Sequence, residues 1–287
     1  MSSAVDLGEP AAVSHGAAGQ PTRRRHDWDR TVVRGTGQTL ITIGLVALLF
    51  VAYELWVTDL LAARSQQQLS EEIHQQWQEA PTVSPAEAGP TAATRSGTAP
   101  SDRAWTPAPI DVGVGDPFAV LHIPRLGDGY SRVVVEGAAQ DQLAQGPGHY
   151  IGTAMPGEQG NVALAGHRVG RGSPFLDLDQ MRPGDPIVVE TADSWFVYRV
   201  LGDPATRSFA GDPSGIPGQE IVRPTDVSAI SPTPDDPWDG PASGAYLTLT
   251  TCHPKFSAQQ RLIIHARLDG APLSKATAPD GPPALNG

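Results

Sequence analysis

The chain contains one cysteine, Cys252, and this residue ends an apolar, β-branched stretch, YLTLTTC (246–252). A single cysteine excludes an internal disulfide and any zinc or redox site built on a C-x-x-C pair. Two interpretations remain. The first is a buried structural thiol, which is a common state of free cysteine. The second is a nucleophile, because a thiolate both attacks an amide and leaves again. The residues around Cys252 favour the nucleophile.

An arginine stands nine residues after the cysteine. Arg261 opens a second β-branched stretch, RLIIHARL (261–268), after a connection that contains Pro254. If the two stretches pair in antiparallel fashion, the ends that carry Cys252 and Arg261 meet. A neighbouring cation stabilises a thiolate and can donate hydrogen bonds to the oxyanion of an acyl intermediate. The spacing therefore predicts a thiol beside a guanidinium.

A general base must come from one of eight histidines. His167 ends the apolar stretch NVALAGH (161–167) and is followed by a Gly-rich turn. A histidine at a strand end, at the mouth of a loop, is well placed to approach a nucleophile on another strand end. His265 shares a strand face with Arg261 but lies about 13 Å further along that strand. We therefore select His167 as the base.

Together these motifs resemble one known family, the sortases. The resemblance rests on GHR at 166–168, TLTTC at 248–252 and the position of Arg261. The sequence CHPKF (252–256) resembles the class E, actinobacterial branch of that family. The resemblance covers about residues 115–268 and implies an eight-stranded β-barrel.

The resemblance also implies an activity. Sortases are cysteine transpeptidases that cleave a C-terminal sorting signal between Thr and Gly and transfer the thioacyl-bound protein to an amine. It implies that Cys252 is the nucleophile and that His167 protonates the leaving amine and then serves as base. It further implies that Arg261 positions the substrate and stabilises the oxyanion. Thr251 matches a position of substrate contact, and class E suggests a Leu-Ala-x-Thr-Gly signal and a cell-wall amine as acceptor.

Two other functions stay open at this stage. A membrane-tethered, non-enzymatic β-domain for adhesion or cell-wall binding would keep Cys252 as a structural thiol. An L,D-transpeptidase also uses a lone cysteine on a β-scaffold. That family, however, places an arginine two residues after the cysteine, where this chain has Pro254. The second alternative is therefore disfavoured.

Short β-branched or aromatic stretches, bounded by Gly, Pro and Asp, predict the elements that carry these residues. This pattern is typical of an all-β barrel with short helices. One helical turn is predicted over residues 173–181, where Pro174 is suited to a first helical position. The eight predicted strands cover residues 119–126, 132–138, 161–167, 186–191, 195–201, 220–223, 246–252 and 261–268.

One segment predicts a membrane helix. Residues 40–57 read LITIGLVALLFVAYELWV and contain a single charge, Glu54. A helix of this length covers about 27 Å, close to the hydrocarbon thickness of a bilayer. Five arginines lie between Arg23 and Arg34, so the positive-inside rule predicts a cytoplasmic N-terminus. No small-x-small cleavage site follows, which favours an uncleaved single-pass anchor.

These features predict five parts of the chain. Residues 1–38 are expected to form a disordered cytoplasmic N-terminus, and residues 39–57 the transmembrane helix. Residues 58–108 are expected to form a helical stalk and a Pro/Ala/Thr-rich linker. Residues 109–269 form the extracytoplasmic catalytic domain, and residues 270–287 a disordered tail.

Charge restricts the partners further. The net charge of −11 argues against nucleic acid, because phosphate binding needs a basic surface. Four acids, Glu136, Asp177, Asp179 and Asp185, are scattered without the spacing of a calcium loop and are interpreted as solvated side chains. We accordingly expect no metal and no cofactor. The expected partners are proteins with a sorting signal, an amine acceptor and the membrane.

Overall fold

A computed structural model describes residues 23–53, 58–79 and 107–286, and the chain divides into two compact units between Ala52 and Tyr53. The first unit holds helix α1 (Arg23–Ala52). Residues Arg30–Ala52 form the one candidate membrane span among the described residues, with a mean hydropathy of 1.8 and no burial inside the protein.

Helix α1 begins well before the predicted span. The sequence predicts disorder over residues 1–38, whereas residues 23–38 are helical in the structure. Residues 1–22 and 54–57 lie outside the described residues, so the end of the predicted span is not covered. The apolar stretch itself is long enough, by length and composition, to cross a bilayer.

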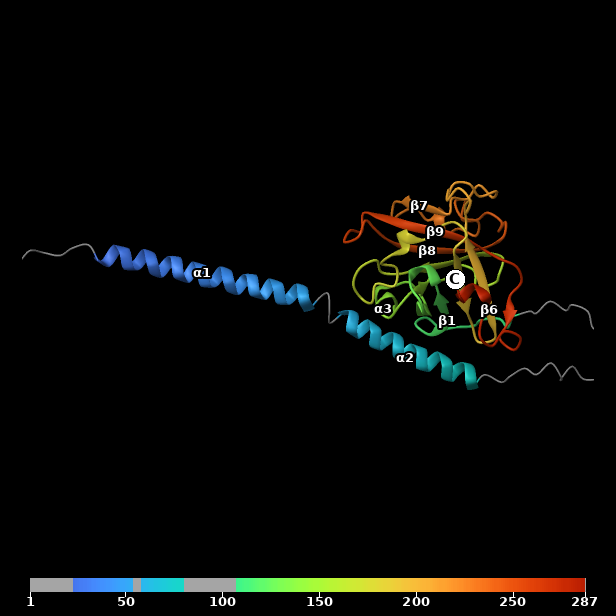
Figure 1. The fold of residues 1–287 in the computed structure, drawn as a ribbon, viewed down its shortest axis with the longest axis horizontal. Coiled ribbons are helices and arrows are strands. Elements are labelled where there is room, and N and C mark those ends of the chain that lie inside the picture. Colours follow the sequence, from blue (N-terminus) through green and yellow to red (C-terminus); the bar gives the residue numbers. More distant parts are fainter. Residues whose placement is uncertain (1–22, 54–57, 80–106, 287) are drawn as a thin grey trace, which may run out of the picture. The chain divides into compact units, whose positions relative to one another are not determined.

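The second unit is a closed β-barrel, as predicted. In the described part of the chain, eight strands form a ring in the order β6-β5-β1-β2-β3-β4-β8-β9, and a β6–β9 pairing closes it (Figure 1). Strands β7 and β10 extend the sheet outside this ring. The strands are β1 (Pro117–His122), β2 (Ser131–Glu136), β3 (Gly148–His149), β4 (Gly160–Ala165), β5 (Pro186–Glu190), β6 (Ser194–Val200), β7 (Gln219–Val222), β8 (Ala245–His253), β9 (Gln260–Leu268) and β10 (Leu273–Ser274).

Short helical segments connect the strands. Where a helical turn is predicted over residues 173–181, the structure has turns followed by a 3₁₀ segment at Leu178–Gln180. The other short segments are helix α3 (Gln140–Leu143) and 3₁₀ turns at Pro124–Leu126, Ser228–Ile230 and Pro283–Asn286.

Alternation along β8 and β9 determines which side chains fill the barrel. Leu247 and Leu249 of β8 are fully buried in the core, together with Leu262 and Ile264 of β9. Successive residues of a strand point to opposite faces, so Thr248 and the other residues in step with it point away from this core. The predicted face of Cys252 is therefore the outer face of the barrel wall.

Helix α2 (Thr58–Glu79) packs against the barrel instead of projecting from it as a free stalk. Leu69 and Ile73, one turn apart, are buried against apolar side chains of β1 and β2. Gln66 closes the contact: its amide nitrogen donates to the carbonyl of Val133 (3.1 Å), and its amide oxygen accepts from the N–H of Val133 (2.8 Å). Because the apolar positions lie on one face of α2, burying that face against β1 and β2 stabilises the docked helix.

The C-terminal residues also differ from the predicted disordered tail. In the described residues after 269, Leu273 pairs with Trp195 and Ser274 with Ser194, which adds β10 to the end of β6. The indole N–H of Trp195 donates to the carbonyl of Ala278 (3.0 Å). The end of β6 and the indole of Trp195 thus supply partners for this segment that its Pro/Ala/Gly composition does not reveal.

Candidate active site

The antiparallel pairing predicted for the two motif strands is confirmed. Strands β8 and β9 pair along their whole length, and Cys252 lies directly opposite Arg261 in the register. Directly opposed residues share a face of the sheet, so the thiol and the guanidinium emerge on the same side. Cys252 is free and half-buried.

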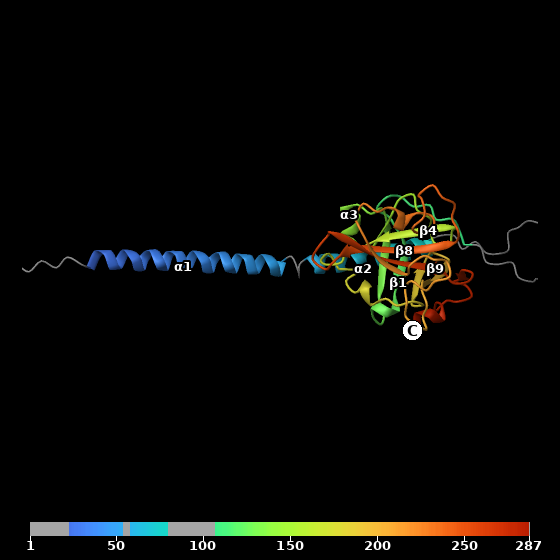
Figure 2. The same ribbon diagram turned by 90° about the horizontal axis from the view of Figure 1, so that it is seen from above.

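A second pairing brings the histidine to the same place. Strand β4 runs parallel to β8, with Ala165 opposite Thr250, and the three strands β4, β8 and β9 lie side by side (Figure 2). The amide of Gly166 donates to the carbonyl of Thr250 (3.1 Å), so the alignment continues past the end of β4. His167 lies two residues after Ala165, and Cys252 lies two residues after Thr250 on the neighbouring strand β8. The structure therefore brings the predicted histidine to the level of the cysteine.

The environment of His167 favours the neutral form of its ring. The side chain is half-buried, and its Nε2 atom is buried with no hydrogen-bond partner among the described residues. Burial, and then the positive charge of Arg171, lower the pKa of His167 from its ordinary value. A neutral imidazole with an unengaged nitrogen can take up a proton from a thiol.

Backbone carbonyls hold part of the guanidinium of Arg261. Its Nη1 atom donates to the carbonyl of Ala258 (3.1 Å), in the β8–β9 connection, and to that of Gln260 (3.0 Å), the first residue of β9. A guanidinium has five N–H donors in a planar fork, and these two bonds use only those on Nη1. Arg261 can thus be held by the loop and still donate to a bound carbonyl.

Thr251, the fourth predicted site residue, lies on the inner face of β8. Only 2 % of it is exposed, and its hydroxyl donates to the carbonyl of Gly166 (2.8 Å). This bond joins the residue before Cys252 to the residue before His167. Thr251 therefore links the two reactive segments, while its predicted contact with substrate stays a prediction.

Sequence reasoning assigned no role to Arg168, although it follows His167 in the GHR motif. Its side chain is 3 % exposed; Nε donates to the carbonyl of Leu176 (2.8 Å) and Nη2 pairs with Asp179 (2.8 Å). These contacts fold the segment after His167 back on itself. The sequence held a weak signal for this ion pair: an arginine before a Gly-rich turn, with an acidic DLD stretch shortly after it.

The interpretation of the four acids as solvated is wrong for Glu136 and Asp185, whereas Asp177 and Asp179 keep much of their side chains exposed. Asp177 pairs with Lys255 of the β8–β9 connection (3.0 Å), and Asp179 pairs with Arg168. The other two are buried: Glu136 pairs with His149 (2.7 Å), and Asp185 pairs with Arg125 (2.7 Å). Sequence separations of 11 to 78 residues hid these partners. Each acid has its own partner, so the four do not converge on one site.

Comparison with known proteins agrees with this geometry. The family model for the Sortase domain matches residues 121–269. Sortase SrtE1 of Streptomyces coelicolor is 34 % identical over 254 residues, which cover 84 % of this chain and 59 % of SrtE1. Sortase SrtE2 of the same organism is 30 % identical over 261 residues, covering 88 % of each chain.

The SrtF sortase from Corynebacterium diphtheriae has a similar solved structure. It is 36 % identical, with a TM-score of 0.56, and the match covers 65 % of this chain and 100 % of that one. The predicted resemblance to sortases of the class E kind is confirmed by these relatives. The chain belongs to the sortase family of cysteine transpeptidases.

Proposed function

We propose that this chain is a membrane-anchored transpeptidase that cleaves a Leu-Ala-x-Thr-Gly-like signal between Thr and Gly and transfers the protein to a cell-wall amine. The observation that carries the proposal is that the ends of β4, β8 and β9 lie side by side. Cys252 is opposite Arg261, and His167 is level with Cys252. Membership of the sortase family supports the same reaction type.

In the first step, the sulfur of Cys252 attacks the carbonyl carbon of the signal's threonine. The thiol proton passes to the neutral ring of His167, and Arg261 donates hydrogen bonds to the oxyanion that develops. When the C–N bond breaks, the imidazolium of His167 returns its proton to the leaving glycine amine. The products are a thioacyl bond to Cys252 and a released C-terminal fragment.

In the second step, an incoming amine attacks the thioacyl carbon. His167 takes a proton from the amine nitrogen, Arg261 again stabilises the oxyanion, and the sulfur of Cys252 leaves as the C–S bond breaks. The new amide joins the substrate protein to the acceptor. The thiolate then recovers its proton, and both groups return to their starting state.

The anchor determines where this chemistry takes place. The arginine cluster between Arg23 and Arg34 lies at the N-terminal end of helix α1, ahead of its apolar stretch, which supports a cytoplasmic N-terminus and an extracytoplasmic barrel. Surface proteins with a sorting signal and cell-wall amines both lie on that side of the membrane. The alanine-containing signal is what the class E resemblance implies, and the similarity to Sortases SrtE1 and SrtE2 supports that resemblance.

The experiment uses the full chain in detergent micelles with a Leu-Ala-x-Thr-Gly peptide, a Leu-Pro-x-Thr-Gly peptide and an amine acceptor. Mass spectrometry should find a thioacyl adduct on Cys252 and a transfer product from the alanine peptide. Cys252→Ala, His167→Ala and Arg261→Ala should abolish or strongly reduce both.

Two matched controls separate chemistry from general damage: Arg267→Ala, exposed on the same strand as Arg261, and His74→Ala, exposed on α2. Both should retain the transfer reaction. Absence of an adduct with either peptide in a folded protein would refute the proposal. A preference for the proline peptide would refute the assigned signal alone.

A further inference from the structure

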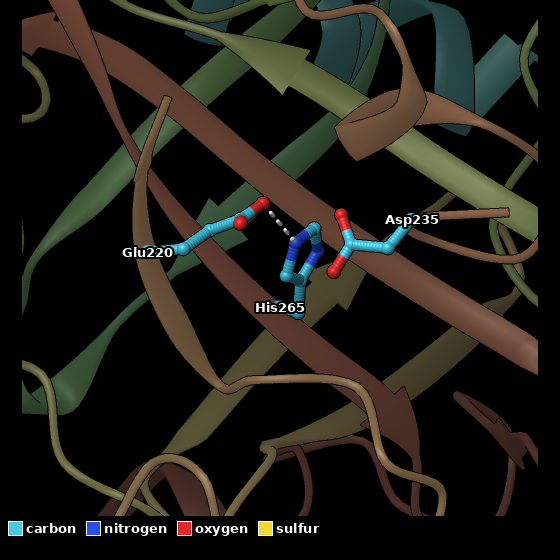
Figure 3. A group of neighbouring side chains, drawn as sticks. All are labelled: Glu220, Asp235 and His265. Atoms are coloured by element: carbon cyan, nitrogen blue, oxygen red, sulfur yellow. Dashed lines mark hydrogen bonds and ion pairs between the residues drawn. The ribbon is translucent and has the colours of Figure 1, made fainter. Parts of the chain in front are cut away.

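Three ionisable side chains gather on the outer wall of the barrel, apart from the proposed catalytic residues. Glu220 comes from β7, Asp235 from the β7–β8 connection and His265 from β9, and their possible ligand atoms all lie within 4.8 Å of one another (Figure 3). His265 is fully buried, and its Nε2 lies 3.2 Å from a carboxylate oxygen of Glu220. The carboxylate of Asp235 faces the same ring from the other side (Figure 3).

A chain of hydrogen bonds determines the tautomer of His265. The amide nitrogen of Asn161 points at two carbonyls, those of Ala229 (3.3 Å) and Ser231 (3.0 Å), so its amide oxygen must be the acceptor that faces Thr248 (2.8 Å). The single hydroxyl proton of Thr248 is thereby used. Thr248 can only accept from Nδ1 of His265 (2.9 Å), and Nδ1 carries the hydrogen.

The other ring nitrogen of a neutral His265 then carries a lone pair. It faces the carboxylates of Glu220 and Asp235, so when both carboxylates are ionised three electron-rich atoms meet with no donor among them. Something positive between these atoms would remove the repulsion.

We propose that Glu220, Asp235 and His265 form a binding site for a divalent transition-metal cation of the zinc type. One imidazole and two carboxylates suit Zn²⁺, whereas Ca²⁺ and Mg²⁺ prefer oxygen ligands alone. Two ligands at about 2.0–2.2 Å in a tetrahedral site lie roughly 3.3 Å apart, close to the 3.2 Å between His265 and Glu220. A small movement of Asp235 in the exposed β7–β8 connection would bring its carboxylate to the same cation as a third ligand.

The surroundings of His265 match those of a metal ligand. A histidine that binds a metal through one nitrogen usually donates its other N–H to a partner that holds the ring in place. Thr248 plays that part, and Asn161 holds Thr248 in turn. This support lies in the barrel wall, on β4 and β8, whereas the two carboxylates come from β7 and the connection after it. A bound cation would therefore attach that connection to strand β9.

The proposal does not depend on the proposed catalysis, and its test measures binding and stability. We would use the untagged full chain in detergent micelles, stripped of metal with a chelator, and carrying Cys252→Ala so that the thiol cannot bind the metal. Calorimetric titration with Zn²⁺ gives stoichiometry and affinity, and Ca²⁺ is titrated in parallel. The visible spectrum with Co²⁺ in place of Zn²⁺ reports the geometry of the ligands.

Glu220→Gln, Asp235→Asn and His265→Gln remove one ligand each. Asp239→Asn is the matched control, since Asp239 is an exposed acid in the same connection and lies outside the cluster. We expect one Zn²⁺ per chain, and a Tm increase of roughly 5–10 °C at about 100-fold excess over Kd. Each ligand substitution should weaken binding by more than ~10-fold, and the control should bind normally.

Three results would overturn the proposal: no saturable Zn²⁺ binding, equal binding by Glu220→Gln, Asp235→Asn and Asp239→Asn, or tighter binding of Ca²⁺ than of Zn²⁺. The two carboxylate variants keep the test decisive even if His265→Gln fails to fold, because both carboxylates lie at the surface side of the cluster. A Tm that follows pH but not Zn²⁺ would show that a proton alone occupies the site.

Discussion

Replacing Thr251 by valine tests whether the link between the cysteine and histidine segments supports catalysis. The hydroxyl of Thr251 donates to the carbonyl of Gly166 at 2.8 Å, and both residues are buried. Valine has nearly the same shape but no hydroxyl, so the carbonyl loses this donor. A buried carbonyl left without its partner costs about 1–3 kcal/mol. For a domain of this size, that corresponds to a decrease in Tm of roughly 2–12 °C.

The same change should slow the reaction. His167 directly follows Gly166, so releasing that carbonyl allows the imidazole to move away from Cys252. A displacement of ~1 Å near the reacting atoms can cost about 100-fold in rate. We expect Thr251→Val to lower kcat by at least ~10-fold while KM for the signal peptide stays close to that of the unmodified chain. Thr251→Ser, which keeps the hydroxyl, should retain most of the rate.

Thermal unfolding and steady-state cleavage of the signal peptide provide the measurements. An increase in KM with unchanged kcat would show that Thr251 contacts substrate, as the family resemblance implies, and would refute the positioning role. Equal losses in Thr251→Val and Thr251→Ser would show that the hydroxyl is not the important group. Either result would show that the hydrogen bond from Thr251 to Gly166 does not position the catalytic residues.

Three further predictions follow from charges and contacts near the barrel. Arg171→Ala removes a positive charge that helps to lower the pKa of His167, so the acid limb of kcat/KM should move to higher pH, and less so at high salt. An unchanged pH profile at low salt would contradict this electrostatic effect. Gln66→Ala should lower Tm through loss of the bonds that hold α2 on the barrel, at about 1–3 kcal/mol; an unaltered Tm would mean that α2 docks by apolar contacts alone. A double-mutant cycle on Lys255 and Asp177 should give a coupling of at most ~1 kcal/mol that decreases with salt, because both groups are partly exposed; a larger, salt-independent value would indicate a desolvated pair.

The sequence by itself determined the strands and where the candidate site residues lie relative to them. Period-two alternation and turn residues recur within a few positions, so all eight predicted stretches correspond to strands of the structure. The pairing of Cys252 with Arg261 was also predictable, because a short connection between two β stretches leaves few alternatives to a hairpin. His167 was found from its place at a strand end.

Contacts between distant segments could be decided only by the tertiary structure. The two-residue strand β3 has no sequence pattern; Gly148 fits there because a side chain would lie 2.2 Å from the carbonyl oxygen of Gly137. The parallel pairing of β4 with β8 brings His167 to Cys252 across more than 80 residues of chain. A local pattern records which face a residue occupies. Which other segment covers that face depends on long-range packing, and packing alone brought the members of the Glu220 cluster together.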